Sequence, residues 1–463
     1  MKKFNIVSAF LTGAMLFSAT SCEKFLEDDV VSPNDPETST ASLILANIEV
    51  ATFATFGGQL ARQSEVMVQR LAGTSAGSQS LEIANYVITD QTNQNEWDVI
   101  YAGVMANSRI MIKDYGAGSP WYAGITKVFM AMNIGLATDL WGDVPFAEAG
   151  FGDNLEPAFQ SQQSVYTGLQ SLLDEAIADL SQPEASNTFL PTTDDFIYNG
   201  DVMMWIQTAN VLKARFANHL SQRDPAASAA DALAAISAGG MTGSSDNCNM
   251  VFFNSGNSLN QWFAYEGQRG GYIRVNATLL DAMVAKSDPR VSVLFGEDDY
   301  GGYSGTPYDQ VDSTSSSYIG ALYASEASPV PLVTYVEQLF IVAEAQLRSG
   351  NAAAAATAHN NAVIESILFL TGSSDANYEA TYASETAGSI SLEKIMTEKN
   401  VAMFLQPEGY TDWRRTGFPS IMANPNAALS DIPRRLPTPQ QERLYNSNAI
   451  VVTDLLSPVW WDN

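Results

Sequence analysis

Side chains with the spacing of a catalytic site are scarce in this 463-residue chain. The two histidines, His219 and His359, belong to no H-E-x-x-H motif, and no C-x-x-C pair is present, so zinc catalysis is not expected. Ser391 and Lys394 match S-x-x-K, a pattern short enough to occur often by chance. Among 51 acidic residues, some carboxylate pair will always suit a glycosidase. We therefore expect no enzymatic activity, with a surface glycoside hydrolase as the less favoured alternative.

The residue whose setting does predict a chemical change is Cys22. A lysine-containing start, an apolar run from Ile6 to Phe17 and small residues at 18–21 precede it. This is the layout of a secretory signal. The cysteine directly after the small residues resembles a bacterial lipobox, in which the thiol takes a diacylglycerol. We expect residues 1–21 to be a signal peptide and Cys22 to be lipidated; plain secretion is the alternative.

The segment after Cys22 is predicted to be a tether. Two or three acyl chains on Cys22 would hold the protein on a membrane, whereas one chain anchors only marginally. Acidic residues from Glu23 to Asp29 look like the surface-export signal of Bacteroidetes lipoproteins, although a solvated acidic tether would have the same composition. Residues 22–40 are therefore predicted to form a lipidated tether and linker. The likeness to Bacteroidetes lipoproteins implies that this tether anchors the protein on the outer membrane, exposed at the cell surface.

Composition excludes several classes of partner and site. A net charge of −28 disfavours nucleic acid and anionic lipid surfaces, because like charges repel. With Cys22 lipidated, Cys248 is the remaining thiol, so no disulfide can form within the chain. The acidic segment 297–312 could hold Ca²⁺ but lacks the ligand spacing of an EF-hand, and we expect a solvated loop. No metal and no cofactor are predicted.

The hydrophobic pattern of the mature chain is mostly helical. Apolar residues at helical spacing predict helices at 42–56, 97–115, 121–140, 164–180, 202–222, 226–237, 331–348, 352–370 and 392–405. Short turns join two of these pairs, which should lie antiparallel and resemble tetratricopeptide repeats. The predicted fold is mostly α, with a helical scaffold over 41–237 and 331–405. The stretches 238–330 and 406–463 are rich in Gly, Ser, Asn and Pro and are predicted to be irregular.

Five segments, in order along the chain, resemble motifs of the SusD/RagB family of outer-membrane lipoproteins, and in particular the SusD-like branch that carries D-W-R-R-T-G. They are Ala137–Phe146 (ATDLWGDVPF), Asp195–Arg215, Ser287–Arg290 (SDPR), Glu398–Gly417 (ending in DWRRTG) and Pro433–Asn446. The resemblance implies a SusD-like domain over 41–463.

The same resemblance implies a function. It implies a lid that captures an oligosaccharide, or a peptide as in some relatives, and closes over a SusC-like TonB-dependent outer-membrane barrel without doing chemistry. A scaffold subunit with little ligand affinity of its own is a further alternative.

The motif residues themselves are predicted to be structural. Trp141, Trp205 and Trp413 are large enough to anchor layers of the core. Asp412, Arg414 and Arg415 are expected to form fork-shaped ion pairs or to bind chain carbonyls, and Gly142 and Gly417 to allow tight turns.

Ligand-binding residues are expected elsewhere, on the long loops at 72–95, 252–272 and 300–318. Aromatic faces there would pack on sugar rings, and Arg, Asn or Gln would bind the hydroxyls; the alternative is that these rings fill the core beneath the loops. The candidates are Tyr86, Trp262, Phe263, Tyr265, Arg269, Tyr272, Tyr300, Tyr303 and Tyr308.

Overall fold

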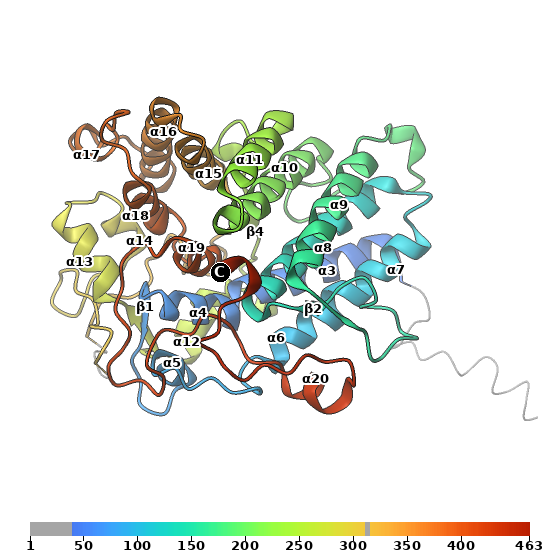
Figure 1. Ribbon diagram of the computed structural model, residues 1–463, viewed down its shortest axis with the longest axis horizontal. Coiled ribbons are helices and arrows are strands. Elements are labelled where there is room, and N and C mark those ends of the chain that lie inside the picture. The colour runs from blue at the N-terminus through green and yellow to red at the C-terminus, as the bar shows by residue number, and fades with distance from the viewer. Residues whose placement is uncertain (1–38, 311–314) are drawn as a thin grey trace, which may run out of the picture.

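The computed structural model of the protein describes residues 39–310 and 315–463 (Figure 1). The predicted signal peptide 1–21, Cys22 and nearly all of the 22–40 tether lie outside the described residues. The described part is mostly α-helical, with three short two-stranded ribbons, which confirms the predicted fold class.

The N-terminal half consists of helices joined by short connections. Its elements are α3 (Ala41–Gly57), α4 (Gln59–Met67), β1 (Leu71–Gly73), α5 (Gln79–Ala84), α6 (Gln94–Asp98), α7 (Ala106–Asp114), α8 (Pro120–Trp141), β2 (Val144–Pro145), β3 (Phe159–Gln160), α9 (Gln162–Leu180), α10 (Val202–His219) and α11 (Pro225–Gly239). A π-helical stretch, Val99–Met105, joins α6 to α7, so the helix predicted over 97–115 is continuous but locally widened.

The C-terminal half mixes short elements with one long helix pair. Its elements are β4 (Cys248–Met250), α12 (Gln261–Gln268), β5 (Ile273–Val275), α13 (Ala277–Ala285), α14 (Val291–Leu294), β6 (Val330–Val333), α15 (Tyr335–Arg348), α16 (Ala352–Thr371), α17 (Ala376–Tyr382), α18 (Leu392–Ala402), α19 (Glu408–Thr416) and α20 (Gln440–Tyr445).

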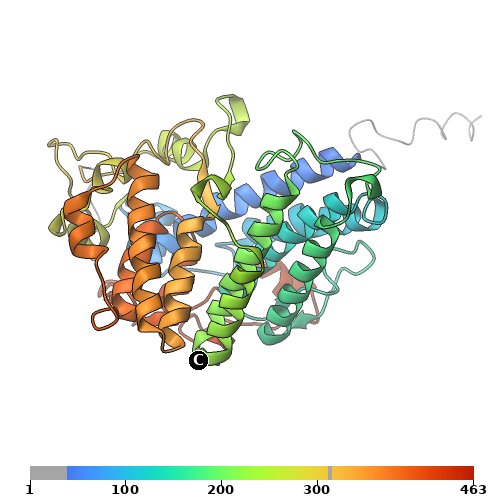
Figure 2. The same cartoon turned by 90° about the horizontal axis from the view of Figure 1, so that it is seen from above.

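Consecutive helices pack as pairs, and the pairs stand in a row. Helix α8 packs on α9, α10 on α11 and α15 on α16, while α9 touches α10 and α11 touches α15 (Figure 2). This is the arrangement of a tetratricopeptide-like solenoid, in which each pair buries its apolar face against its neighbours. The loop-rich segments between α11 and α15 lie along one side of that row (Figure 2).

The structure corrects some of the predicted helix positions. The helix predicted from residue 331 starts at Tyr335, because Val330–Val333 forms β6 and pairs antiparallel with β4. All four residues of β6 are apolar and buried. Periodicity alone cannot distinguish such a short apolar run in a buried strand from the first turn of a buried helix. The stretches predicted to be irregular also contain helices: residues 408–416 form α19, and α12, α13 and α14 lie within 238–330.

One helical stretch, Ala41–Met67, is long and apolar enough to meet the length and hydropathy criteria for a membrane span. It combines α3 and α4, and 61% of its most apolar window is buried inside the protein. Core helices of folded proteins meet the same criteria, and most of this window is buried in the core.

Buried ion pairs join the scaffold helices through the family motifs. Arg215 on α10 donates to Glu337 on α15 from both Nε (2.5 Å) and Nη2 (2.6 Å). Arg415 on α19 holds Glu344 on α15 with both terminal nitrogens, the Nη2–Oε2 distance being 2.7 Å. Arg414 instead donates to the Asp139 carbonyl at 2.6 Å. The predicted fork-shaped pairs and carbonyl contacts are therefore confirmed.

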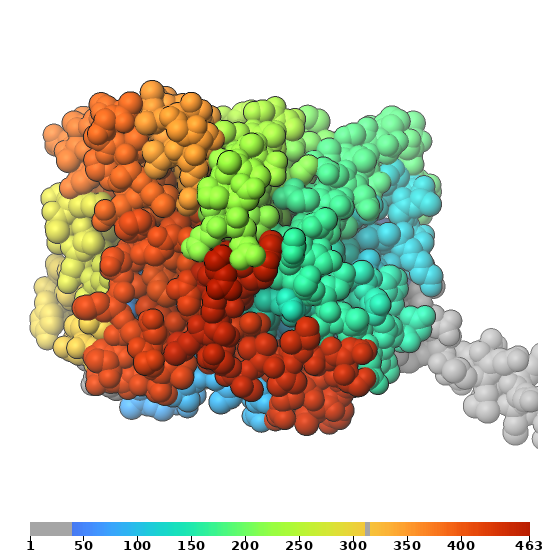
Figure 3. All heavy atoms as spheres, in the orientation of Figure 1, coloured from blue at the N-terminus to red at the C-terminus, as the bar shows by residue number. Residues whose placement is uncertain are grey.

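The C-terminal segment after α19 lies across the front of the molecule (Figure 3). It is held by main-chain and side-chain contacts to the end of α8: Leu436 N donates to the Leu140 carbonyl at 2.8 Å, and Trp461 Nε1 donates to Asp139 Oδ1 at 2.9 Å. Trp461 is fully buried. Leu436 and Trp461 thus tie this segment to the core.

Candidate ligand-binding site

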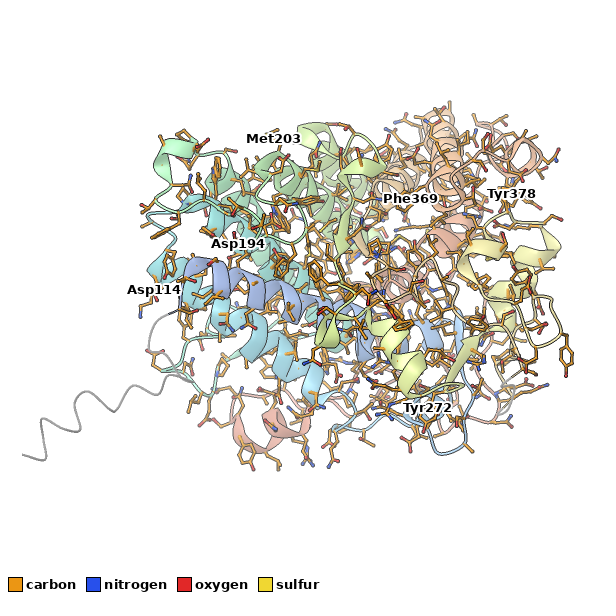
Figure 4. The ribbon with its side chains drawn as sticks, turned by 180° about the vertical axis from the view of Figure 1, so that it is seen from behind. Asp114, Asp194, Met203, Tyr272, Phe369 and Tyr378 are labelled. Atoms are coloured by element: carbon orange, nitrogen blue, oxygen red, sulfur yellow. The ribbon has the colours of Figure 1, made fainter. Side chains whose placement is uncertain are left out.

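The three loop groups predicted to bind ligand come together on one side of the molecule. Strand β1 pairs antiparallel with β5, with Ala72 opposite Arg274, and so joins the first group to the second. The third group joins through Thr306, whose N–H donates to the Val275 carbonyl at 2.8 Å. Figure 4 shows the face that these loops share, with Tyr272 labelled.

The turn after β1 is tightly fitted to its neighbours. A Cβ on Gly73 would lie 2.0 Å from the Ser80 carbonyl oxygen, so only glycine fits there. Thr74 N donates to the Tyr272 carbonyl at 3.1 Å, and Thr74 Oγ1 donates to the Gly271 carbonyl at 2.6 Å. These contacts fix the backbone on which Tyr272 is presented.

Helix α12 carries several of the predicted candidates. Tyr265 is half-buried: its hydroxyl lies 2.8 Å from Ser80 Oγ, and the Arg62 guanidinium lies 4.3 Å from its ring centroid. Phe263 is also half-buried. Arg269, directly after α12, is exposed and lies 6.0 Å from the ring centroid of half-buried Tyr272. A cation beside an aromatic face at the surface can bind both the hydroxyls and the apolar face of a sugar.

Two predicted contacts are closed off from solvent in this structure. Trp262 is 1% exposed and Tyr86 is 4% exposed, so neither ring presents a face at the surface. The reason for Trp262 is the cap of α12: Asn260 Oδ1 accepts the N–H groups of Trp262 and Phe263, while its Nδ2 donates to the carbonyls of Tyr323 and Ser328. The cap thus starts the helix with Trp262 facing inward. These two rings fill the core beneath the loops.

Among the candidates of the third loop group, Tyr300 has the most exposed ring. Tyr300 is 88% exposed, whereas Tyr303 and Tyr308 are half-buried. The turn beneath Tyr300 is organised by Asp298, which accepts from Ser304 Oγ at 2.6 Å and from two main-chain N–H groups. The Ser304 hydroxyl and these amides hold the pKa of Asp298 below its usual value. Residues 311–314 of this group lie outside the described residues.

Residues Gly73 to Gly77, which begin at the last residue of β1, have the sequence G-x-S-x-G. This motif forms a nucleophile elbow only when a histidine reaches the serine. Both histidines are buried elsewhere: His359 Nε2 lies 3.2 Å from the Tyr382 carbonyl, and His219 contacts Glu408, Asp139 and Tyr166. The geometry therefore gives Ser75 no base.

His219 belongs to the core, not to a catalytic site. Its Nε2 lies 2.7 Å from Glu408 Oε1, and its Nδ1 lies 2.8 Å from the Tyr166 hydroxyl and 3.4 Å from Asp139 Oδ2. Burial by itself would lower the pKa of His219, but the carboxylates of Glu408 and Asp139 outweigh it and raise that pKa to about 9. The ring is 0% exposed and so is inaccessible to a ligand. In the part of the chain that the structure describes, no cluster of His, Cys, Asp or Glu has the arrangement of a metal site.

Sequence reasoning missed one feature of the same face, a hollow of about 170 Å³ walled by phenylalanines. The pair Phe252–Phe253 stands at the start of the second loop group and could have suggested it. Phe53 lies on α3 and Phe196 lies in the loop before α10, and no sequence pattern places them beside that pair.

The model of a SusD-like family, described as starch-binding and associating with the outer membrane, matches residues 33–439. The chain belongs to the SusD-like family. Solved structures with the same fold include a chitin-binding SusD homolog from Flavobacterium johnsoniae, which is 22% identical with a TM-score of 0.79 and matches over 90% of this chain and 98% of that one.

Two further structures extend the comparison of this SusD-like protein. A SusD/RagB family protein from Bacteroides thetaiotaomicron is 23% identical with a TM-score of 0.76 over 92% of this chain and 99% of that one. A protein titled chitin-binding is 23% identical with a TM-score of 0.78 over 91% of this chain and 100% of that one. Among curated protein sequences, none matches this chain. At these identities the structures establish the shared SusD-like fold.

Proposed function

We propose that this SusD-like protein captures an oligosaccharide on the loop face and delivers it to a SusC-like TonB-dependent barrel in the outer membrane. The observation that carries the proposal is the surface pairing of Arg269 with Tyr272 on a backbone fixed by β1 and β5. Half-buried Phe263, Tyr265, Tyr303 and Tyr308 and exposed Tyr300 extend the set of candidate contacts. Capture needs no catalytic group.

Two glycan classes are the first to test. The matching family is described as starch-binding, and two relatives of the same fold are named as chitin-binding. An N-acetylglucosamine oligomer and a maltooligosaccharide should therefore be titrated into the chain from Glu23 onward by calorimetry. Binding of either glycan, with no release of smaller sugars, supports capture without hydrolysis.

Variants of the surface pair locate the site. Arg269→Ala and Tyr272→Ala are each expected to weaken binding by about tenfold, because each removes a stacking face or a charge-assisted hydrogen bond. Tyr445→Ala is the matched control, since Tyr445 is 75% exposed on α20 and belongs to none of the three loop groups. Flat titrations with both glycans and with peptide pools would refute ligand capture and favour the scaffold alternative.

The proposal includes an anchor and a partner. The family description associates such proteins with the outer membrane. Lipidation of Cys22 would place this chain there, and Cys22→Ala should move it from the membrane fraction to the soluble fraction. Co-purification of the wild-type protein with a large outer-membrane barrel would support delivery. Wild-type protein found as a free periplasmic monomer would refute it.

A further inference from the structure

The phenylalanine hollow is built from three segments that are far apart in the sequence. Val50 and Phe53 come from α3, Phe196 from the loop before α10, and Phe252 and Phe253 from the chain after β4. The rings meet in two pairs: Phe53 with Phe252 and Phe196 with Phe253, each pair with centroids 6.0 Å apart.

The hollow is open at its rim. Val50 is 55% exposed and Phe253 is 48% exposed, although both are large apolar side chains that burial would stabilise. Phe253 is held there by a turn, in which its N–H donates to the Ser258 carbonyl at 2.9 Å. An exposed apolar surface that the fold maintains in this way is typical of a contact site.

Uncharged polar side chains edge the hollow. Asn257 and Gln261 line it, and neither side-chain amide is engaged with another described residue. Every side chain that lines the hollow is uncharged. A carboxamide offers both a donor and an acceptor, so this lining suits a neutral ligand that carries an amide next to an apolar group.

The hollow adjoins the proposed ligand face. Gln261 begins α12, and Arg269 directly follows its end. Eight residues of helix span about 12 Å, so one extended ligand can reach both ends. Figure 4 looks onto this face, with Tyr272 on one side of α3 and Asp194, which precedes the Phe196 loop, on the other.

We propose that the phenylalanine hollow receives the acetamido group of an N-acetylated sugar in the captured oligosaccharide. The methyl group enters between the phenyl rings, and the amide exchanges hydrogen bonds with Asn257 or Gln261. The size agrees, since a cavity of about 150 Å³ holds a benzene molecule, and this one measures about 170 Å³. The inference rests on the proposed function and assigns that function a preference for acetylated over unacetylated glycans.

The test compares two ligands that differ only at the acetamido group. An oligomer of β-1,4-linked N-acetylglucosamine and the matching oligomer of β-1,4-linked glucose are titrated by calorimetry into the chain from Glu23 onward. Burying one methyl group and forming one amide hydrogen bond predicts about tenfold tighter binding of the acetylated oligomer.

Two variants probe the hollow from opposite directions. Phe253→Ala removes one wall, and Val50→Trp fills the mouth from α3; both sites are largely exposed, so folding should be retained. Each variant is expected to abolish the tenfold preference while leaving binding of the glucose oligomer unchanged. Phe151→Ala is the matched control, because Phe151 is 45% exposed and lies outside the hollow. In saturation-transfer NMR, the acetyl methyl signal should be strong with wild-type protein and weak with Phe253→Ala.

The outcomes separate the hollow from the proposed function. Equal binding of both oligomers, or a preference that survives Phe253→Ala and Val50→Trp, would overturn the assignment of the hollow while leaving capture intact. If neither oligomer binds, the assignment of the hollow is overturned. Capture itself falls only if the maltooligosaccharide and the peptide pools also give flat titrations. Displacement of the acetylated oligomer by a neutral peptide with an apolar side chain, at lower concentration, would assign the hollow to peptides instead.

Discussion

Replacement of Arg415 by methionine tests whether the D-W-R-R-T-G motif holds the fold together. Arg415 is 1% exposed and joins three elements: its Nη2 lies 2.7 Å from both Glu344 Oε2 and Asp412 Oδ1, and its Nη1 donates to Ser221 Oγ at 2.9 Å. In Arg415→Met, Glu344 stays buried and keeps only its contacts to Arg348 and Asn218.

The loss of stability expected for Arg415→Met comes from the buried charge that remains on Glu344. Removing one partner of a buried ion pair typically destabilises a protein by about 3–5 kcal/mol. We expect a loss of this size in the free energy of unfolding, measured by urea titration with tryptophan fluorescence. Arg443→Met is the matched control, because the pair between Arg443 and Asp90 is 39% and 27% exposed and should contribute less than about 1 kcal/mol.

A double variant separates charge from packing. Arg415→Met combined with Glu344→Met removes both charges, and apolar replacements of a buried pair are often close to neutral. The double variant should therefore be more stable than Arg415→Met alone. The reasoning is refuted if Arg415→Met costs no more than Arg443→Met. Because Arg415 lies away from the loop face, glycan affinity of the folded variant should match the wild type.

Three further predictions concern other buried groups. Glu408 and Asp139 outweigh the effect of burial and raise the pKa of His219 to about 9. The stabilising contribution of the protonated ring is therefore complete below pH 6.5 and is lost as the pH rises through 9. The melting temperature should fall over that pH range, and it should fall less in His219→Gln. Gly73→Ala should cost about 1–3 kcal/mol through overpacking and weaken glycan binding, as measured by thermal melting and calorimetry; a variant with wild-type stability would contradict the 2.0 Å clash. Burial raises the pKa of the Cys248 thiol, so a thiol reagent should modify the native chain from Glu23 onward only as fast as it unfolds; rapid labelling in the absence of urea would show the thiol to be accessible.

The long helices could be predicted because local sequence determines them. Helix α8 was predicted over 121–140 and spans Pro120–Trp141, since apolar residues recur at helical spacing along it. It ends at Gly142, which takes a φ of +84° that other residues rarely adopt. Helix α16 likewise ends at Gly372, with a φ of +76°.

Strand β6 and helix α19 show where local sequence was insufficient. The buried run Val330–Val333 is extended because β4, far away in the sequence, supplies its hydrogen bonds. Helix α19 owes its place to Arg415, Arg414 and Glu408, which bind three different parts of the core. Short segments of this kind take their conformation from tertiary contacts.

For the ligand-binding loops, too, the sequence indicated some features and distant contacts determined the others. The sequence placed the candidate aromatics in three loop groups, and the structure brings those groups together through β1, β5 and Thr306. The sequence could not indicate that Trp262 faces the core while Arg269 faces solvent, since both belong to one short polar-aromatic segment. That choice depends on the hydrogen bonds of Asn260 to a distant loop.

Helical periodicity and linear motifs are local properties, so the sequence alone predicted the helical scaffold, the membership of the SusD-like family and a lipidated Cys22. Which rings are accessible, and where a ligand could lie, depends on the tertiary fold. Burial is a relation between segments far apart in the chain, as in the hollow where Phe53 of α3 meets Phe252. No local pattern records which distant side chain will cover a given ring.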